Sequence, residues 1–459
     1  MFDDWMLSAL AAPLSARLQG EDVAVSSVGT DSRNVRPGQL FVALVGERFD
    51  GHDFLSDVAA RGAAAALVSQ PQPGLPLPQL VVADTRVALG RLGALNRDRF
   101  AGRIAAVTGS SGKTTAKEMI ASILRVDEGA DAAVLATRGN LNNELGVPLT
   151  LLELGPAHRS AIIELGASGV GEIAWTVSLV RPQVSLLTNA GSAHVGAFGG
   201  PEKIVEAKGE ILEGLDAQGV AVLNRDDKAF ATWQARAAGR RVVSFALADE
   251  RADFRAEALA ADHRGCLGFD LCTPLGRAPV QLNLLGRHNV ANAVAAAAVA
   301  ASLGVGLESI VRGLEAVQPV KGRGVVLYGA NGVRLIDDTY NANPVALCAA
   351  IDILAGFPGR RLLALGDMGE LGEWSEQGHR EVGEHARGRV DALYAVGPQM
   401  AHAVAAFGPG GRHFADQAAL IEALRPECQA DTTLLIKGSR SAAMDKVVAA
   451  LSEAPLEKH

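Results

Sequence analysis

The stretch IAAVTGSSGKTTAKEMIASIL, from Ile104 to Leu124, decides how the rest of the chain is interpreted. An apolar run leads into a cluster of glycine, serine, lysine and threonine, and a helical pattern follows. Such a loop between a strand and a helix start is typical of phosphate binding, because backbone N–H groups and the helix dipole favour an anion. Lys113 and Thr114 fit the lysine and hydroxyl positions of a P-loop. The sequence therefore predicts a nucleotide-binding loop here.

The spacing of this loop differs from the usual P-loop. A standard loop would have a glycine at position 107, but the chain has Val107, and the first glycine is Gly109. A generic glycine turn capping a helix is the alternative, although the strand before it and the helix after it favour the nucleotide loop. The predicted ATP-binding residues of the loop are Gly109, Ser110, Ser111, Gly112, Lys113, Thr114 and Thr115.

Length and composition restrict the class of protein. The chain has 459 residues, too many for one hydrophobic core, so we expect two or three domains. Hydrophobic residues make up 48% and charged residues 20%, an ordinary globular balance. The formal charge of −8 argues against a general nucleic-acid binder, which normally carries a basic surface. Small anionic substrates stay possible, since their sites need only local positive charge.

The cysteines and the chain start predict a cytoplasmic protein. The four cysteines are scattered without metal-type pairing, which is typical of reduced thiols in the cytosol. The start, MFDDWMLSAL, lacks the basic region and apolar run of a signal peptide. We find no run of about 18 apolar residues and expect no membrane span.

Two series of alternating strands and helices predict an α/β fold with parallel sheets. Before them, residues 1–83 hold short strand-like runs such as QLFVALVG and QLVVAD. The first series contains IAAVTG, SAIIELGAS, VSLLTNAG and GVAVLNRDD, and the second, from about residue 315, contains GVRLIDDTYNANP, RRLLALGDMGELG, DALYAVGPQM and DTTLLIKGSRS. We predict three domains: a small N-terminal α/β substrate domain (1–83), a central P-loop ATPase domain with a parallel sheet (84–314) and a Rossmann-like α/β domain (315–459).

Polar side chains lie at strand ends of the central domain, where parallel sheets bind ligands. Glu164 closes SAIIE and could hold magnesium beside a nucleotide. A cap or a surface charge is the alternative for this glutamate. His194 lies in the glycine-rich TNAGSAHVGAFGG, where an isolated histidine is usually only a polar loop residue.

Lys208 lies on a helical face that should be buried. In PEKIVEAKGEILEGL it shares that face with Ile204, Leu212 and Leu215. One explanation is snorkelling, in which the stem packs and the ammonium reaches water. The other is that burial lowers the pKa, so that the neutral amine takes part in chemistry.

Together these motifs resemble the muramyl ligase family of peptidoglycan synthesis. The similar segments run in order along essentially the whole chain: TGSSGKTT, GNLNNELGVPLTLL, ELGAS, TNAGSAHV, EAKGEI and GRHNVANAVAAAA. The N-terminal TDSRNVRPGQLFVALVGERFDGHDF is similar to the UDP-sugar-binding module of two ligase types, which act on the dipeptide and tripeptide intermediates. The resemblance therefore implies an ATP-dependent amide ligase.

The C-terminal motifs resemble one of these two types. DDTYNANP (Asp337–Pro344) and GDMGELG (Gly366–Gly372) are similar to segments of the members that add D-alanyl-D-alanine. The diaminopimelate-adding members carry Asp-Asn-Pro-Arg, which is absent here. The implied substrates are UDP-N-acetylmuramoyl-tripeptide and D-alanyl-D-alanine.

The resemblance also implies roles for individual residues. ATP would bind the P-loop, with Lys113 on the outer phosphates, and His288, Asn289, Asn292, Arg323 and Asp338 would complete its site. Two magnesium ions would be held by Thr114, Glu164, His194 and Lys208, where Lys208 would react with CO2 to form a carbamate. The implied catalytic residues are Lys113, Lys208, His194 and Arg323. The implied substrate-binding residues are Ser32, Arg33, Asn140, Asn142, Asn143, Asn341 and Asn343, with Lys437 and Arg440 in the neighbourhood of the dipeptide.

For each polar loop residue a plain loop hydrogen bond is the alternative. Three other functions also stay open. They are a folylpolyglutamate-synthase-like ligase, an NTPase or kinase without ligase activity, and a non-catalytic binding protein. We expect a monomer that binds no nucleic acid and has no membrane span.

Overall fold

The computed structural model describes residues 1–459 except 3, 47–48, 192–197, 199, 370 and 453–459. The contacts between residues divide the chain into two compact units. Unit 1 comprises Met1–Glu257, Asp270–Pro279 and Ala291–Leu314, and unit 2 comprises Ala258–Phe269, Val280–Val290 and Glu315–His459. None of the helices in the described ranges combines the length and the apolar character that crossing a bilayer requires.

Unit 1 begins with a small five-stranded sheet. Its order is β2-β7-β6-β5-β4, and only β2 is antiparallel to its neighbour. The strands are β2 (Arg17–Gln19), β4 (Ser27–Gly29), β5 (Gln39–Val42), β6 (Ala65–Val68) and β7 (Gln79–Val81), with the pair β1 (Trp5–Met6) and β3 (Ala24–Val25) beside helix α1 (Leu7–Leu14) and with α2 (Leu55–Ala60). The strands β5 and β6 are buried throughout, so this sheet has a core of its own.

Helix α3 (Thr85–Asp98) follows this sheet and leads to the central one. The Asp84 side chain caps it by accepting hydrogen bonds from the N–H groups of Arg86 and Val87. The central sheet has the order β16-β15-β14-β13-β12-β11-β8-β10-β9. Its parallel part consists of β8 (Arg103–Thr108), β9 (Val134–Ala136), β10 (Ser160–Glu164), β11 (Val184–Leu187), β12 (Val220–Asn224) and β13 (Arg241–Ala246).

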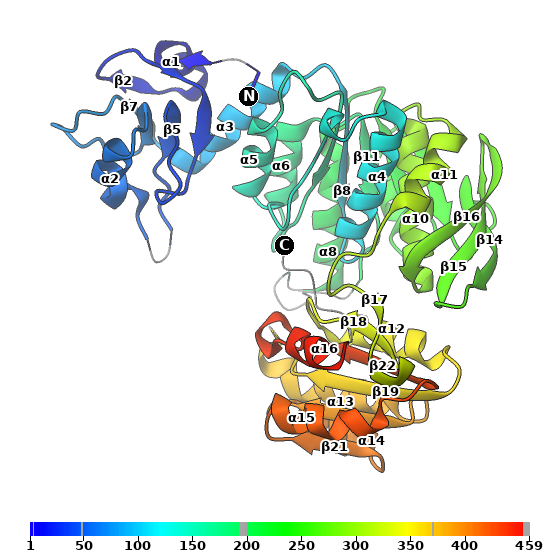
Figure 1. Ribbon diagram of the computed structural model, residues 1–459. Helices are drawn as coiled ribbons and strands as arrows, with labels where there is room; N and C mark the ends of the chain where they lie inside the picture. The colour runs from blue at the N-terminus through cyan, green and yellow to red at the C-terminus, as the bar shows by residue number, and fades with distance from the viewer. Residues whose placement is uncertain (3, 47–48, 192–197, 199, 370, 453–459) are drawn as a thin grey trace. The chain divides into compact units, whose positions relative to one another are not determined.

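Helices cover both faces of the parallel part, as Figure 1 shows. One face packs against α5 (Gly146–Leu152), α6 (Glu172–Val180), η3 (Glu210–Gly214) and α9 (Phe230–Arg236), and helix α4 (Lys113–Glu128) packs along β8, β9 and β10. The chain continues from β8 to β9 on one side and later to β11 on the other, so the strand order reverses at β8. In such sheets ligands bind outside the carboxyl ends of the strands at this reversal.

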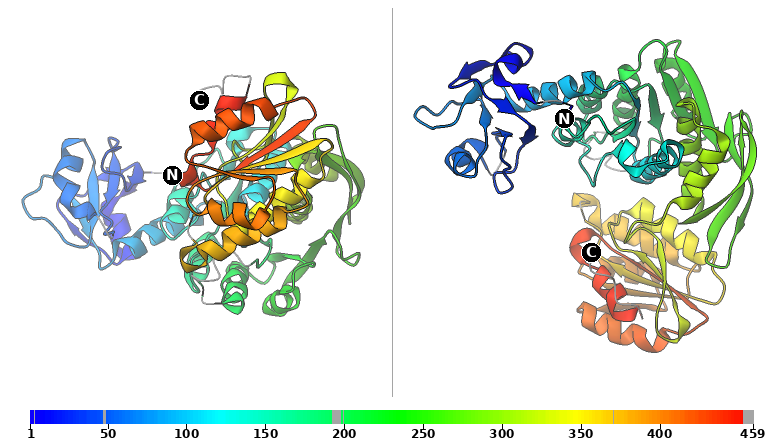
Figure 2. Two further views of the ribbon diagram at one scale, coloured as in Figure 1. Left: turned by 90° about the horizontal axis from the view of Figure 1, so that it is seen from below. Right: turned by 45° about the horizontal axis from the view of Figure 1, so that its top comes forward.

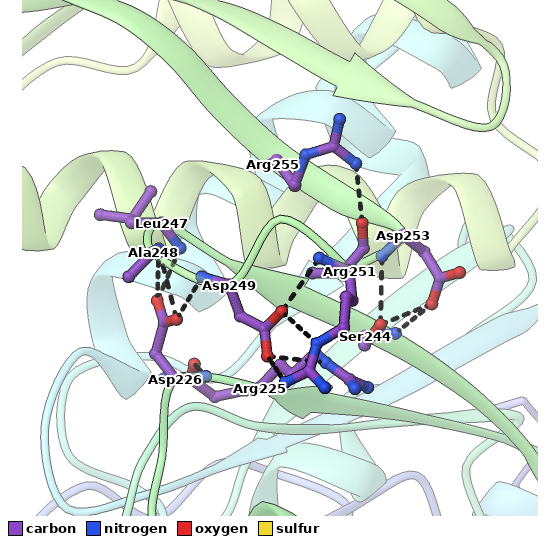
Figure 3. A network of polar contacts seen from close by, with 11 residues as sticks. Arg225, Asp226, Ser244, Leu247, Ala248, Asp249, Arg251, Asp253 and Arg255 are labelled. Carbon is purple, nitrogen blue, oxygen red and sulfur yellow. Dashed lines mark hydrogen bonds and ion pairs between the residues drawn. The ribbon is translucent and has the colours of Figure 1, made fainter.

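Beyond β13 the sheet continues through β14 (Phe254–Ala261), β15 (Cys266–Thr273) and β16 (Gly276–Leu285), which the sequence analysis did not predict. Figure 3 shows the polar network at the turn that precedes β14. The Asp226 carboxylate accepts hydrogen bonds from the N–H groups of residues 247–249, and Asp249 pairs with Arg225 and Arg251. The network ties the end of β12 to this turn and has a structural role.

Three further helices belong to this region. Helix α8 (Pro201–Gly209) lies between β11 and β12, and α10 (Arg287–Ser302) and α11 (Leu307–Ala316) follow β16. Helix α11 packs closely on α4, since a Cβ at Gly313 would lie 2.3 Å from the Cα of Ile123.

Unit 2 contains a six-stranded sheet of order β17-β18-β22-β19-β20-β21, parallel except for β17. Its strands are β17 (Val325–Tyr328), β18 (Arg334–Asp338), β19 (Arg360–Gly366), β20 (Ala392–Val396), β21 (Gly411–Phe414) and β22 (Thr432–Lys437). Helices α12 (Pro344–Ala355), α13 (Ser375–Ala386) and α14 (Met400–Phe407) pack on one face, and α15 (Gln417–Leu424) and α16 (Asp445–Leu451) on the other (Figure 2, left).

The predicted α/β class with parallel sheets is confirmed. Each of the eight quoted strand segments of the two series contains an observed strand. The four cysteines are free thiols, as expected. Contacts group residues 1–83 with the central region, and unit 2 takes two segments from before residue 315. The three predicted domain boundaries therefore stay predictions.

Candidate active site

The phosphate loop connects β8 to α4 in a left-handed conformation that needs glycine. Gly109 has φ +148° and Gly112 has φ +79°. A Cβ at Gly109 would lie 1.9 Å from Oγ1 of Thr188, and one at Gly112 would lie 2.4 Å from Oδ1 of Asn292. The second contact brings Asn292, a predicted ATP-binding residue on α10, against the loop.

The residue at position 107 explains the unusual spacing. Val107 is fully buried inside β8 and pairs with Glu164 of β10 and Leu186 of β11. The strand extends to Thr108, so no loop residue exists where longer P-loops have their first glycine. The loop is shortened because the strand is extended.

Lys113 begins helix α4 and turns back over the loop. Its Nζ donates a hydrogen bond of 2.7 Å to the carbonyl of Gly109. The side chain thus lies across the loop whose amides would hold a phosphate. Thr114 and Thr115 occupy the first turn of α4, where unpaired N–H groups and the helix dipole favour an anion.

Glu164 is buried at the end of β10 and is neither a helix cap nor a surface charge. It is 2% exposed, and its Oε1 accepts hydrogen bonds from Asn142 Nδ2 (2.8 Å) and Thr114 Oγ1 (3.3 Å). Its Oε2 has no hydrogen-bond partner among the described residues. A buried carboxylate oxygen without a partner is costly, and a divalent cation would satisfy it. This orphaned oxygen fits the predicted magnesium site.

Lys208 faces inward, as the helical pattern predicted. It is 4% exposed, and Ile204, Leu212 and Leu215 on the same face are also buried. Its Nζ lies 5.2 Å from the centre of the Phe198 ring. The low exposure excludes snorkelling into open water.

Burial changes the acid–base chemistry of this lysine. Burial and the neighbouring ammonium of Lys113 lower the pKa of Lys208 to about 8, against the opposing effect of Glu172 and Glu210. Near neutral pH the neutral amine is therefore a larger minority than in an exposed lysine.

The phosphate loop, Lys113 and Lys208 line one cavity of about 520 Å³ at the carboxyl end of the central sheet. Its lining combines a P-loop, amide side chains, two carboxylates and two lysines. The lining residues are Gly109, Ser110, Lys113, Asn140, Asn142, Asn143, Glu144, Gly166, Ala167, Ser168, Glu172, Phe198 and Lys208. The structure thus unites the P-loop with Lys208 and the three predicted asparagines.

Two of these asparagines also have local roles. The Asn143 side chain accepts a hydrogen bond of 2.9 Å from Gly146 N–H at the start of α5. The Asn142 carbonyl accepts one of 2.7 Å from Gly166 N–H, which ties the loop to the end of β10. Ser32 and Arg33 lie after β4 and do not line the cavity; Arg33 is exposed and pairs with Asp31 at 2.9 Å.

The sequence analysis missed several residues that hold this site together. Lys117 is 1% exposed on α4, and its Nζ donates a hydrogen bond of 2.6 Å to the carbonyl of Thr137. The Thr137 hydroxyl accepts a hydrogen bond of 2.9 Å from Glu164 N–H. Thr188 and Asn189 contact the P-loop from the end of β11. The local pattern of TGSSGKTT gives no signal for these long-range contacts.

The predicted residues of unit 2 gather at the carboxyl end of its own sheet. Asp338 ends β18 beside Lys437 at the end of β22, and their side chains form an ion pair of 2.7 Å. Lys437 is 4% exposed and also donates to the carbonyls of Asp338 and Asn341. Because its three N–H bonds have these oxygen partners, Lys437 holds the strand ends together, and its place in the neighbourhood of the dipeptide stays a prediction.

The other predicted residues of unit 2 have varied surroundings. The Arg323 guanidinium lies 4.3 Å from the centre of the Tyr340 ring. The Asn343 side chain caps α12 by accepting a hydrogen bond of 2.8 Å from Ala346 N–H, and its predicted contact with the substrate stays a prediction. Asn341, Arg440 and His288 are exposed, and Asn289 is buried and donates to the carbonyl of Leu285.

The predicted metal site includes a residue that the structure does not describe. His194 falls outside the described residues. Among the described residues, no three His, Cys, Asp or Glu side chains gather as a metal cluster would. The predicted magnesium set differs from such a cluster, since it combines one carboxylate with a hydroxyl, a modified lysine and His194.

Three family models match consecutive parts of the chain. They are the Mur ligase family catalytic domain (residues 24–96), the Mur ligase middle domain (107–300) and the Mur ligase glutamate ligase domain (322–440). The matches cover an N-terminal, a middle and a C-terminal domain in order, so three domains are present.

Curated relatives match over the full length. The UDP-N-acetylmuramoyl-tripeptide–D-alanyl-D-alanine ligase of Escherichia coli is 46% identical over 97% of this chain and 98% of its own. The enzyme of the same name from Haemophilus influenzae is 41% identical over 97% of both.

Solved structures match as well. MurF from Acinetobacter baumannii has a TM-score of 0.91 and 40% identity and covers 99% of this chain, which covers 100% of that one. MurF ligase from Thermotoga maritima in complex with ADP has a TM-score of 0.83 and 29% identity, covering 93% of this chain and 97% of its own.

Proposed function

The chain belongs to the Mur ligase family, and on this premise we propose that it joins D-alanyl-D-alanine to UDP-N-acetylmuramoyl-tripeptide at the expense of ATP. The products would be the UDP-muramoyl-pentapeptide, ADP and phosphate. The observation that carries the choice of substrates is the 46% identity, over 97% of the chain, to a ligase named for this reaction. The cavity that unites the P-loop with Lys208 supports the use of ATP, and Glu164 accepts a hydrogen bond from Asn142 in its wall.

The bond to be formed explains why ATP is needed. A carboxylate does not react with an amine in water, because its oxygen is a poor leaving group. Transfer of the γ-phosphoryl group to the tripeptide carboxylate gives an acyl phosphate and ADP. The dipeptide amine then attacks the acyl carbon, the tetrahedral intermediate expels phosphate, and the amine loses a proton.

The residues around the cavity would promote the first step mainly through charge and position. Two anions, the carboxylate and the triphosphate, must come together there. We propose that Lys113 and the loop amides hold the outer phosphates and that Arg323 supplies further positive charge. Asn140, Asn142 and Asn143 would orient the muramoyl substrate from the wall of the cavity.

We propose magnesium sites at Thr114, Glu164, Lys208 and His194. Magnesium neutralises phosphate charge when bound. The orphaned Oε2 of Glu164 supports this assignment from the chain's own chemistry. We also propose that the neutral Lys208 amine takes up CO2, forming an N–C bond and releasing a proton, which replaces a cation by an anion beside the metal.

We propose further contacts to ATP and to the two other substrates. Asn289, His288, Asn292 and Asp338 would contact the nucleoside of ATP, and Ser32 and Arg33 the uridine of the second substrate. Asn341 and Arg440 are exposed at the end of the sheet in unit 2 and would contact the dipeptide. We further propose a cytoplasmic monomer with domains 1–83, 84–314 and 315–459, in line with the free thiols and the three matched regions.

Phosphate release from ATP tests the function directly. We expect release only when UDP-N-acetylmuramoyl-tripeptide and D-alanyl-D-alanine are both present, together with a pentapeptide product of the expected mass. Release with water alone would indicate an NTPase. Release with a folate and glutamate would indicate the folylpolyglutamate type, and either result would contradict the proposal.

A further inference from the structure

One residue outside the P-loop makes four hydrogen bonds to it. Asn189 follows β11 in the TNAG segment. Its Oδ1 accepts hydrogen bonds from the N–H of Ser111 (3.1 Å) and the hydroxyl of Ser111 (3.2 Å). Its Nδ2 donates to the carbonyl of Ser111 (3.1 Å), and its own carbonyl accepts from Ser110 N–H (3.0 Å). The side-chain amide thus pairs with the backbone of Ser111 in both directions.

The turn that carries Asn189 is itself fixed. Thr188 Oγ1 donates a hydrogen bond of 2.7 Å to the carbonyl of Ser111. From β12, Asn224 Nδ2 donates to the carbonyl of Thr188 (2.8 Å), and Asp227 accepts from Ala190 N–H (2.8 Å). The turn therefore lies between the P-loop and the end of β12, with hydrogen bonds on both sides.

The glycine-rich loop needs contacts from outside to hold one backbone conformation. Gly109 and Gly112 flank the two serines, and glycine allows many backbone conformations in the absence of outside contacts. A phosphate site works best when its N–H donors are already in place, because no free energy is then lost on ordering them.

We propose that Asn189 is a positioning residue for ATP: it fixes Ser110 and Ser111 so that the amides of residues 112–114 stay aimed at the phosphates. The proposal rests on the ATP site proposed above and adds a residue to it. An amide side chain carries an acceptor and a donor on separate atoms, so Asn189 both accepts from Ser111 N–H and donates to the Ser111 carbonyl. Aspartate keeps the acceptor, loses the donor and adds a negative charge beside the phosphates.

The test is the binding of Mg-ADP to the full-length protein by titration calorimetry. We expect Asn189→Ala to raise the Kd for ADP and the KM for ATP on the order of tenfold, since several hydrogen bonds that order the loop are lost. Asn189→Asp should weaken ADP more than alanine does. The KM for D-alanyl-D-alanine should not change in either variant. A general loss of structure would change this KM as well.

Asn96→Ala is the matched control. The Asn96 side chain is fully buried away from the cavity lining, and its Nδ2 donates to the carbonyls of Leu151 and Leu154. We expect this variant to lower the melting temperature and leave the Kd for ADP unchanged. The proposal is overturned if a folded Asn189→Ala protein binds ADP like the wild type, or if Asn96→Ala weakens ADP equally.

The ADP measurement needs neither amino-acid substrate. If the wild-type protein binds ADP and fails to release phosphate with both substrates, the proposed ligase reaction is wrong and the role of Asn189 still stands on its own binding result.

Discussion

Two lysines at the central cavity illustrate how burial decides what an ammonium group does. Lys113 lies partly buried across the phosphate loop, where a permanent positive charge is useful. Lys208 is buried in the lining of the same cavity, and the charge of Lys113 contributes to its lowered pKa. The two residues are therefore coupled, because the positive charge of Lys113, which would hold a phosphate, also favours the neutral form of Lys208.

Replacing Lys113 tests the phosphate loop. We expect Lys113→Ala to reduce ligation about 10²–10³-fold, because a cation that stabilises the transferred phosphoryl group is lost. Circular dichroism and the melting temperature should show an intact fold. Lys446, an exposed lysine, serves as the control, and Lys446→Ala should leave turnover unchanged. Near-normal turnover of Lys113→Ala would contradict the assignment of this loop.

Replacing Lys208 tests the carbamate. We expect Lys208→Ala to lose most activity and to regain part of it with acetate or another short carboxylic acid, which would replace the missing carboxylate. The control is Lys203→Ala on the same helix, since Lys203 is exposed and pairs with Glu206 at 2.7 Å. Full activity of Lys208→Ala without any added acid would count against the carbamate.

The pH dependence of Lys208 has a definite sign. Its pKa in the folded protein, about 8, lies below the ordinary 10.5. The cost of burying the charged form is present at low pH and is relieved as the pH rises from 8 to 10.5. The neutral amine that reacts with CO2 becomes abundant over the same rise through pH 8.

At the scale of elements, helix α4 is anchored at both ends. Its first residue follows the phosphate loop, and its last residue, Glu128, lies at the amino-terminal ends of β8 and β10. There Glu128 accepts hydrogen bonds from Arg103 (2.5 Å), Ser160 (2.6 Å) and Arg159 (2.7 Å), and Arg103 and Ser160 begin β8 and β10. One carboxylate thus ties the helix to two strands.

This anchor predicts a stability effect that depends on pH. Burial opposes ionisation of Glu128, but the hydrogen bonds outweigh it and lower its pKa from 4.5 to about 2. Its stabilising contribution is complete above pH 4.5 and is lost as the pH falls towards 2. We expect Glu128→Gln to reduce the free energy of unfolding at pH 7 by about 2–3 kcal/mol, and the difference from the wild type to shrink below pH 4.5.

Urea unfolding at pH 7 and pH 3 measures this effect. Glu213→Gln is the control, because Glu213 pairs with Arg236 at the surface, where ion pairs contribute about 0–1 kcal/mol. If the two variants lose equal free energy of unfolding, the Glu128 hydrogen bonds stabilise the protein no more than a surface ion pair does.

At the scale of the whole molecule, the two compact units do not follow the predicted boundary at residue 315. Unit 2 includes Ala258–Phe269 and Val280–Val290. Cys266 and Leu285 from these segments belong to the same buried cluster as Ile336 and Phe357. The core of unit 2 thus draws on chain that precedes the boundary.

A fragment of residues 315–459 tests this arrangement. Without Cys266 and Leu285 the fragment exposes part of its core, and losing the packing of a residue such as Phe357 typically costs about 3 kcal/mol. We expect the fragment to unfold at lower denaturant than unit 2 within the full chain, as followed by hydrogen exchange in α12 and β18. Equal protection from hydrogen exchange in the fragment and in the full chain would show that residues 315–459 form a stable domain by themselves.

Local patterns in the sequence determined the class of fold and the centre of the site. Apolar strands alternating with helices predicted the parallel sheets, since strand and helix periodicities reflect burial on one or both faces. The helical spacing around Lys208 predicted an inward lysine, and the strand–glycine–helix order predicted the phosphate loop. These features depend on neighbours a few residues apart.

Tertiary structure alone decided which distant groups support that site. Asn189 lies 78 residues from Ser111 and Asn142 lies 22 from Glu164, and the strand order brings each pair within hydrogen-bond distance. Likewise, Lys437 forms a buried ion pair with Asp338 because β22 lies beside β18, a partner that the sequence analysis did not predict. The partner of a polar side chain depends on which strands are adjacent, and adjacency in a sheet has no local pattern in the chain.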